Sequence, residues 1–326
     1  MGRYPSQVGR YVARRVLIAI PTLLVISFVV YAILALAPGD PLAQFAANPN
    51  VPGEVRERIR ESLGLNQPWH IRYVKWLLAL LKGDFGYSFG SHSPVAGLLV
   101  ERLPNTLAVV GVAYVFGVLL ALPIGMISAV KRYSLFDHAA TTFAFIGFSV
   151  PTFFTGLLLI IVFSIKLRWF PFIYDSTVKV TDLASLVEQM KQSIMPIAVL
   201  TLFNTAALAR FIRAEMLEHL PLEYVRTARS KGIAERFVIL RHVLRNSLIP
   251  VVTLVALGIP AVFAGAIVTE QIFRVPGIGE LLVRSIGNSD TPVVAAIVFL
   301  FAILVVVFNL IADVLYAVLD PRIRYA

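Results

Sequence analysis

Long runs of apolar residues, separated by polar connections, make up most of the chain. An α-helix rises about 1.5 Å per residue, so about 20 apolar residues cross a hydrocarbon core of about 30 Å. Six runs reach this length, and an even number of crossings returns the chain to the side on which it began. The predicted spans are Val16–Leu36, Thr106–Ser128, Ala139–Phe163, Ile194–Ile212, Leu248–Val268 and Pro292–Leu319.

These runs predict an all-α membrane protein with six transmembrane helices and no second soluble domain. The connection after the first span is long, and one charged loop interrupts the later spans. In chain order we predict a cytoplasmic N-terminus at 1–15, a first transmembrane helix at 16–36, a helical extracytoplasmic loop region at 37–105, a five-helix transmembrane core at 106–319 containing a cytoplasmic loop at 213–247, and a cytoplasmic C-terminus at 320–326.

The composition agrees with this class and narrows the chemistry. Hydrophobic residues make up 58% of the chain and charged residues 15%, against about 45–50% and about 25% in soluble domains. No cysteine is present, which excludes disulfides, thiolate metal sites and cysteine nucleophiles. The five histidines are scattered without a helical ligand pair, so we expect neither a metal site nor an enzymatic activity.

The net charge of +10 follows the predicted topology. Sixteen of the 29 basic residues lie in the segments assigned to the inside, and six lie in the short outside loops near 164–193 and 270–291. This asymmetry matches the positive-inside rule, so both termini are predicted to be cytoplasmic and no nucleic-acid partner is expected. The inside segments are 1–15, 129–138, 210–247 and 319–326.

The outside loops carry local helix signals. Glu54–Leu63 predicts a short charged helix, and Trp69, Tyr73 and Trp76 lie on one face of another. Aromatic residues favour the headgroup level, so we expect this second helix at the outer interface or packed against the rest of its loop. Another helix is predicted after Pro94, and short helices are predicted after Asp175–Asp182 and after the turn at Arg274–Gly279.

A few polar side chains interrupt the later spans. Two interpretations stay open: a polar pathway through spans three to six, or hydrogen bonds between helices and repair of the backbone around Pro151. No acidic chain runs through the membrane, which argues against a proton-coupled carrier. The candidates are Ser149, Thr152, Asn204, Thr205, Asn309 and Asp313.

The loop between the fourth and fifth spans has a more definite pattern than a simple connection. Pro221 suits a first helical turn, and Gly232 is a natural C′ residue. Glu223 lies at the positive end of the helix dipole, with Arg229 and Lys231 at the negative end. These signals predict a helix of about ten residues that ends at Gly232.

The surface of this predicted helix is also patterned. Tyr224 and Ala228 share one face with Val225 beside them, and Glu223 can pair with Arg226. So short a helix needs packing to hold it, and either a partner protein or anionic lipid would serve. A second helix is predicted to follow, with an apolar face at spacings of four, three and four made by Ile233, Phe237, Leu240 and Leu244.

Motifs along nearly the whole chain resemble those of ABC-importer permeases. Glu223–Gly232, followed by Arg241–Pro250, resembles the EAA-type coupling loop of that family. More narrowly, the chain is similar to the first permease subunit of dipeptide and oligopeptide importers. The other matching motifs are Ala37–Pro41, Leu63–Pro68, Gly83–Ser88, Arg102–Thr106, Ser149–Gly156, Glu270–Gly279 and Leu319–Arg322.

The resemblance implies a type I-like permease fold and a set of partners. A second, similar permease subunit pairs with the chain, two ABC ATPase subunits or one fused ATPase drive it, and an extracytoplasmic binding protein delivers the solute. ATP and Mg²⁺ bind to the ATPases, so this chain needs no cofactor. The residues carried over to ATPase coupling are Glu223, Tyr224, Arg226, Ala228, Lys231 and Gly232, with Tyr224 and Ala228 expected to face the partner.

The implied function is translocation of short peptides across the bacterial cytoplasmic (inner) membrane by alternating access. Relatives with the same loop signature carry nickel or glutathione, so the solute stays open. Ser230, Ser247 and Asn288–Thr291 depart from the usual pattern, and the last of these leaves the outer-loop contacts open.

The sequence also bears on the energy source. A P-loop requires G-x-x-x-x-G-K-[ST], and none of the seven lysines follows a glycine. ATP-driven transport would therefore need another chain. The alternatives are a secondary transporter or channel, which would need an ion-coupling chain or an inverted repeat that we do not see, and a membrane scaffold without transport.

Overall fold

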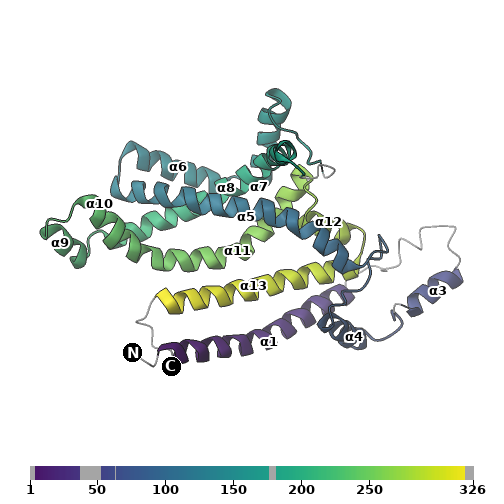
Figure 1. The fold of residues 1–326 in the computed structure, drawn as a ribbon. Coiled ribbons are helices and arrows are strands. Elements are labelled where there is room, and N and C mark those ends of the chain that lie inside the picture. Colours follow the sequence, from purple (N-terminus) through teal and green to yellow (C-terminus); the bar gives the residue numbers. More distant parts are fainter. Residues whose placement is uncertain (1–3, 37–52, 63, 176–180, 320–326) are drawn as a thin grey trace.

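The computed structural model of the protein describes residues 4–36, 53–62, 64–175 and 181–319. Every regular element within these ranges is a helix (Figure 1). The helices are α1 (Tyr4–Leu36), α3 (Gly53–Ser62), α4 (Trp69–Leu81), α5 (Val95–Val130), α6 (Leu135–Ser149), α7 (Thr152–Leu159), η1 (Ile160–Lys166), α8 (Leu183–His219), α9 (Glu223–Ser230), α10 (Glu235–Phe237), η2 (Val238–Leu244), α11 (Arg245–Phe273), α12 (Ile278–Gly287) and α13 (Thr291–Leu319), where η1 and η2 are π-helical.

Five of the predicted spans are confirmed as helices long and apolar enough to cross a bilayer. Several extend beyond the predicted limits: α1 begins at Tyr4, inside the segment predicted as a cytoplasmic N-terminus. The short helix expected after Asp182 is instead the start of α8, which runs on through Pro196. The motif at Ala37–Pro41 and the segment 320–326 lie outside the described residues.

The third predicted span, at 139–163, is wrong as a single helix. The chain bends by 103° between α6 and the helix formed by α7 and η1. Val150 is extended, because the ring of a following proline disfavours the helical conformation. Pro151 also lacks the N–H that would continue the ladder, and the neighbouring Ser and Thr do not repair it.

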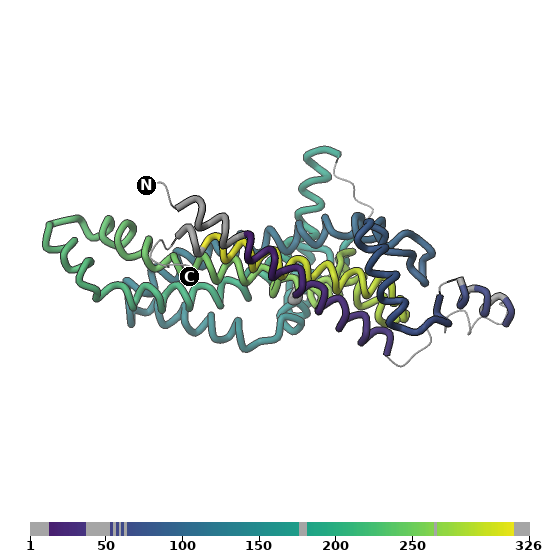
Figure 2. The backbone as a smooth tube through the Cα atoms, turned by 90° about the horizontal axis from the view of Figure 1, so that it is seen from below, coloured from purple at the N-terminus to yellow at the C-terminus, as the bar shows by residue number. Residues whose placement is uncertain are grey.

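The centre of the molecule is the pair α5 and α8, which run in the same direction, with α6 and α11 packed against α8 (Figures 1 and 2). Glycines on α5 allow the pair to approach closely. A Cβ at Gly117 would lie 2.9 Å from the Cβ of Asn204, and one at Gly125 would lie 2.7 Å from the carbonyl oxygen of Ala209. Small residues at a helix interface are a recurrent solution to packing in membranes.

Helix α1 packs along α13 at the edge of the molecule, and α4 packs against α1 (Figure 1). The aromatic face of α4 was predicted to meet the outer interface or its own loop, but it meets the first span. Tyr73 lies edge-on to Phe28, with ring centroids 5.4 Å apart, and its hydroxyl is 2.9 Å from the Oγ of Ser27. Trp76 contacts Tyr31 at 5.3 Å.

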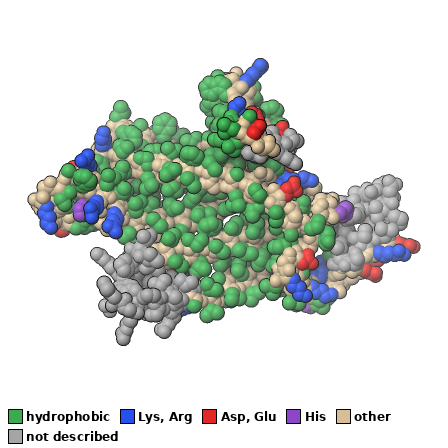
Figure 3. Space-filling view, in the orientation of Figure 1, with side chains coloured by type: hydrophobic (Ala, Val, Ile, Leu, Met, Phe, Trp, Pro, Cys, Tyr) green, Lys and Arg blue, Asp and Glu red, His purple; other side chains and the backbone are tan. Residues whose placement is uncertain are grey.

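The long helices give the molecule two distinct ends. Helices α9 and α10 lie at one end, and α3, α4 and α12 lie at the other (Figure 1). Apolar side chains cover the flank between the ends, while Lys and Arg side chains gather around α9 (Figure 3). This banded surface is what a bilayer-spanning protein requires.

Candidate coupling site

Helix α9 has 8 residues, fewer than the about ten predicted. Its C-terminal end lies where the sequence predicted it, but its N-terminal end does not. Its N-cap is Leu222, so Pro221 precedes the helix and does not occupy its first turn. The C-terminal boundary is confirmed: Gly232 has a φ of +75° and donates its N–H to the carbonyl of Arg229 at 2.9 Å. A left-handed residue at this point is favourable for glycine and strained for most others.

Packing within the chain holds α9 in place. Val225 is 0% exposed and Ala228 is 4% exposed, and both belong to an apolar cluster with Met216 of α8 and with Val238 and Val243 of η2. Isolated helices of this length are unstable in water, so this cluster fixes the position of α9. The cluster therefore joins α9 to the end of α8 and to the segment that leads into the fifth span.

The expected outward face of α9 needs a correction. Ala228 points into the chain, so the described structure does not leave it free to contact a partner. Tyr224 lies at the edge, 36% exposed, with its hydroxyl 2.9 Å from the Nδ1 of His219. Partial burial raises the pKa of the Tyr224 hydroxyl.

The outer surface of α9 is charged and internally paired. Arg226 donates to Glu223 at 2.9 Å, which confirms the pair predicted from their spacing. Arg229 reaches past Gly232 to Glu235 on α10, with Nη2 2.7 Å from Oε1, and this bond raises the pKa of the guanidinium. These exposed pairs contribute at most about 1 kcal/mol each, so they shape the surface more than they stabilise it.

The second predicted helix forms, but with a different face buried. Of its expected apolar face, Ile233, Phe237 and Leu240 are exposed. Only Leu244, the fourth member, is partly buried against the same cluster. The buried residues are Val238 and Val243, five positions apart. The reason is that η2 is π-helical, with hydrogen bonds from i to i+5 that shift the register of the faces.

An ion pair next to this site was missed by the sequence reasoning. Asp137, near the start of α6, is 2% exposed and accepts from Arg213 of α8 through two bonds of 2.6 and 2.8 Å. It also accepts from the N–H of Tyr133, so it ties the α5–α6 turn to α8. Such bidentate pairing is the strong form of an arginine–carboxylate contact.

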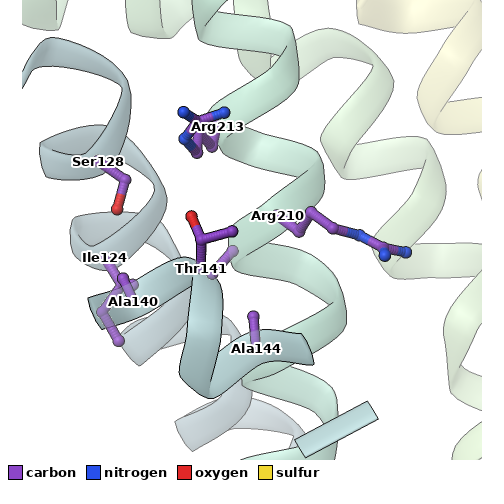
Figure 4. A pocket seen from close by; sticks show the side chains of 8 residues that line it. Ile124, Ser128, Ala140, Thr141, Ala144, Arg210 and Arg213 are labelled. Carbon is purple, nitrogen blue, oxygen red and sulfur yellow. The ribbon is translucent and has the colours of Figure 1, made fainter. Parts of the chain in front are cut away.

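A small pocket lies beside this pair, between α5, α6 and α8 (Figure 4). Its volume of about 310 Å³ includes open solvent, so it is not comparable with the enclosed volume of a ligand pocket. In Figure 4 the side chain of Arg210 extends away from Ser128 and Thr141. The lining residues are Ile124, Ser128, Ala140, Thr141, Ala144, Ala209, Arg210 and Arg213.

The six polar candidates in the spans do not gather at one place. Asn204 is buried where α8 meets α5, and Thr205 donates across the same interface to the carbonyl of Gly117 at 3.4 Å. Asp313 of α13 pairs with Arg15 of α1 at 3.2 Å. The remaining three are Ser149 at the bend, Thr152 at the start of α7, and Asn309, exposed on α13.

At the opposite end, two buried carboxylates fasten the loops and α12. Glu270 is 0% exposed and accepts from the hydroxyl of Thr106 at 2.7 Å and from the N–H of Gly279 at 2.7 Å. Asp290 accepts from the N–H groups of Phe89 and Gly90 at 3.0 and 3.2 Å. Asp290 lies within Asn288–Thr291, the segment in which the sequence departs from the family pattern.

These features define the class of protein: a polytopic helical membrane protein with a packed, charged loop helix at one end. Two family models match the chain. Residues 121–325 match the Binding-protein-dependent transport system inner membrane component, and residues 8–110 match the N-terminal membrane component of the same kind of system.

Curated relatives match over nearly their full lengths. The oligopeptide transport system permease protein AppB of Bacillus subtilis (strain 168) is 42% identical over 316 residues, 97% of this chain and 99% of the relative. The glutathione transport system permease protein GsiC of Salmonella paratyphi A (strain ATCC 9150 / SARB42) is 38% identical over 315 residues, with the same coverage. A putative peptide transport system permease protein of Brucella abortus (strain 2308) is 38% identical over 314 residues, 96% of this chain and 98% of the relative.

A solved structure has the same fold. It is titled as inward-facing conformations of the MetNI methionine ABC transporter, with a TM-score of 0.54, 19% identity, and coverage of 68% of this chain and 96% of that one. The chain belongs to the binding-protein-dependent transport system inner membrane components, as an ABC-importer permease of the peptide family. The resemblance found in the sequence is thereby confirmed, and the protein is a multi-pass inner-membrane permease.

Proposed function

We propose that the chain is the membrane subunit of an ATP-driven importer of short peptides, and that α9 is where partner ATPases act on it. The observation that carries the proposal is the dual character of α9. Its inner face is buried against α8 and η2, while its outer face presents Glu223, Arg226 and Lys231. A docking helix needs an exposed surface that the ATPase can contact. It also needs firm packing against the helices whose positions change during transport.

The proposed mechanism is alternating access. ATP and Mg²⁺ bind to the partner ATPases, whose closure displaces α9 through its exposed face, at the edge of which Tyr224 lies. Val225 and Ala228 pass that displacement to α8 and to the fifth span, and Gly232 allows the chain to turn sharply between α9 and α10. In this proposal Ala228 acts by internal packing.

The same proposal includes the other partners and the orientation. A second, similar permease pairs with this chain, two ATPase subunits or one fused ATPase bind at the α9 end, and a binding protein delivers solute at the α12 end. The α9 end and both termini are then cytoplasmic. The gathering of basic side chains around α9 supports this orientation through the positive-inside rule.

A second candidate solute is glutathione, because a glutathione permease is as similar to this chain as one of the peptide permeases. The test is ATP-dependent uptake by the complete transporter in liposomes, using labelled di-, tri- and oligopeptides, glutathione and Ni²⁺ in parallel. We expect uptake of peptides of more than one sequence. Uptake confined to glutathione or Ni²⁺ would overturn the peptide proposal, and ATP-dependent uptake of none of these solutes would contradict import.

A further inference from the structure

The segment that joins α9 to the fifth span contains a single π-helical turn, η2. It lies in an otherwise continuous helical run from Glu235 to Phe273. A π-turn holds one more residue than the α-turn it replaces, and such turns inside α-helices are frequent at functional sites. Its position here, directly between a loop helix and the span it leads to, calls for a physical reason.

The sequence of this segment offers two apolar faces, one for each register. With α spacing, the apolar face is made by Ile233, Phe237, Leu240 and Leu244. Of these, Leu244 already packs against the cluster in the described structure. With π spacing, it is made by Val238 and Val243, which are the residues that the structure buries. Phe237 and Leu240 are left 49% and 51% exposed. Either register can therefore bury an apolar face against the same cluster.

Two side chains just beyond the turn donate to carbonyl groups of η2 itself. Asn246 donates to the carbonyl of His242 at 2.6 Å, and Ser247 donates to the carbonyl of Val243 at 3.0 Å. Ser247 is fully buried and also lies 3.5 Å from the carbonyl of Glu215 on α8. Pro250 has no N–H, so the backbone ladder is further weakened one turn on.

We propose that η2 is a register switch between the coupling helix and the fifth span. In one state the π-turn buries Val238 and Val243; in the other, an α-turn buries Phe237 and Leu240 in their place. A shift of one residue rotates the preceding segment by about 100° relative to α11. The inference rests on the proposed function, since ATPase closure acting on α9 is what selects the α register.

The test uses the absence of cysteine from the chain. Leu240→Cys and Val238→Cys are introduced singly into the complete transporter, and maleimide labelling is compared without nucleotide and with ATP trapped by vanadate. Without nucleotide we expect Leu240→Cys to react and Val238→Cys to be protected. With trapped ATP we expect the rate of maleimide labelling to fall at least tenfold for Leu240→Cys and to rise by a comparable factor for Val238→Cys.

Simple coverage by an ATPase would lower labelling of Leu240→Cys without raising that of Val238→Cys, and this result would overturn the switch. Val251→Cys is the buried control, because Val251 belongs to the same cluster beyond the π-turn. It should stay protected in both states, and its exposure would indicate general opening and contradict the switch. A complex with ATP-dependent uptake but unchanged labelling disproves the switch alone, whereas a complex without such uptake disproves the proposed function.

A second pair of variants tests the switch without nucleotide. Ser247→Ala removes the hydroxyl that donates to a carbonyl of the π-turn, so labelling of Leu240→Cys should already fall severalfold in the resting complex. Thr253→Ala is the matched control, since Thr253 makes the same kind of bond to the carbonyl of Ile249, 3.4 Å away, within α11. Equal labelling in the two variants would contradict the role assigned to Ser247.

Discussion

At the scale of single residues, the molecule combines contacts within one turn of helix with contacts between residues far apart in the sequence. Gly232 and the Glu223–Arg226 pair were predicted because they depend on neighbours within one turn of helix. The bonds from Arg213 to Asp137 and from Ser88 to Asp290 join residues 76 and 202 positions apart, and no local pattern marks them. Sequence reasoning therefore found the boundary of the coupling helix and missed the anchors of the bundle.

Glu270 supplies a first prediction at this scale. Glu270→Ala leaves the donors of Thr106, Gly279 and Glu280 without their acceptor inside the protein. Each unsatisfied buried donor costs about 1–3 kcal/mol, so the melting temperature of the purified chain in detergent should fall by several degrees or more. Glu188→Ala removes one partner of an exposed pair with Lys191 and is the control. It should change the melting temperature little. An equal effect of the two substitutions would show that Glu270 does not fasten α12.

Gly232 supplies a second prediction, about the end of α9. Gly232→Ala places a Cβ at a φ of +75°, with no neighbouring atom within 4 Å, so conformational strain of about 1 kcal/mol or more is the whole effect. We expect lower ATP-dependent uptake per ATP hydrolysed, since α9 loses its defined end. Gly287→Ala also meets no atom within 4 Å and lies in α12, so it is the matched control. Unchanged uptake per ATP in Gly232→Ala would contradict the coupling role of this turn.

At the scale of helices, the sequence predicted where apolar segments occur but not how two of them bend. The period of apolar residues is the same on either side of Pro151, so pattern alone gave one span where the structure has two helices. In the coupling loop, α spacing and π spacing each place apolar residues on one face of the helix. Tertiary packing against Met216 and Ala228 decides between them, and local spacing carries no information about that packing.

The bend at Pro151 gives a prediction at this scale. Pro151→Ala restores an N–H and relieves Val150, so a straighter α6–α7 connection becomes accessible. Spin labels on Leu135→Cys and Ile165→Cys, both exposed, should then show an added population at longer distance in pulsed EPR. Pro123→Ala in α5 is the control and should leave the distribution unchanged. An unchanged distribution in Pro151→Ala would mean that packing of Gly156 against Phe273 alone sets the bend.

At the scale of the whole molecule, the described part of this single chain does not gather its polar side chains into one route. Asn204 and Thr205 lie between α5 and α8, whereas Asp313 lies between α13 and α1. The proposed pairing with a second permease would allow a solute pathway to form between the two chains. The banded surface, by contrast, follows directly from composition and was predictable.

The final prediction concerns the source of energy. The sequence has no P-loop, and no acidic chain runs through its predicted spans. Liposomes that contain this chain and its permease partner without ATPases should therefore take up no peptide under a proton or sodium gradient. Adding the ATPases, the binding protein and ATP should give uptake against the solute gradient, because force then enters through α9. A hydrolysis-deficient ATPase is the control, since it binds ATP without completing the cycle. Gradient-driven uptake without ATPases would instead identify a secondary transporter, and α9 would then need a different explanation.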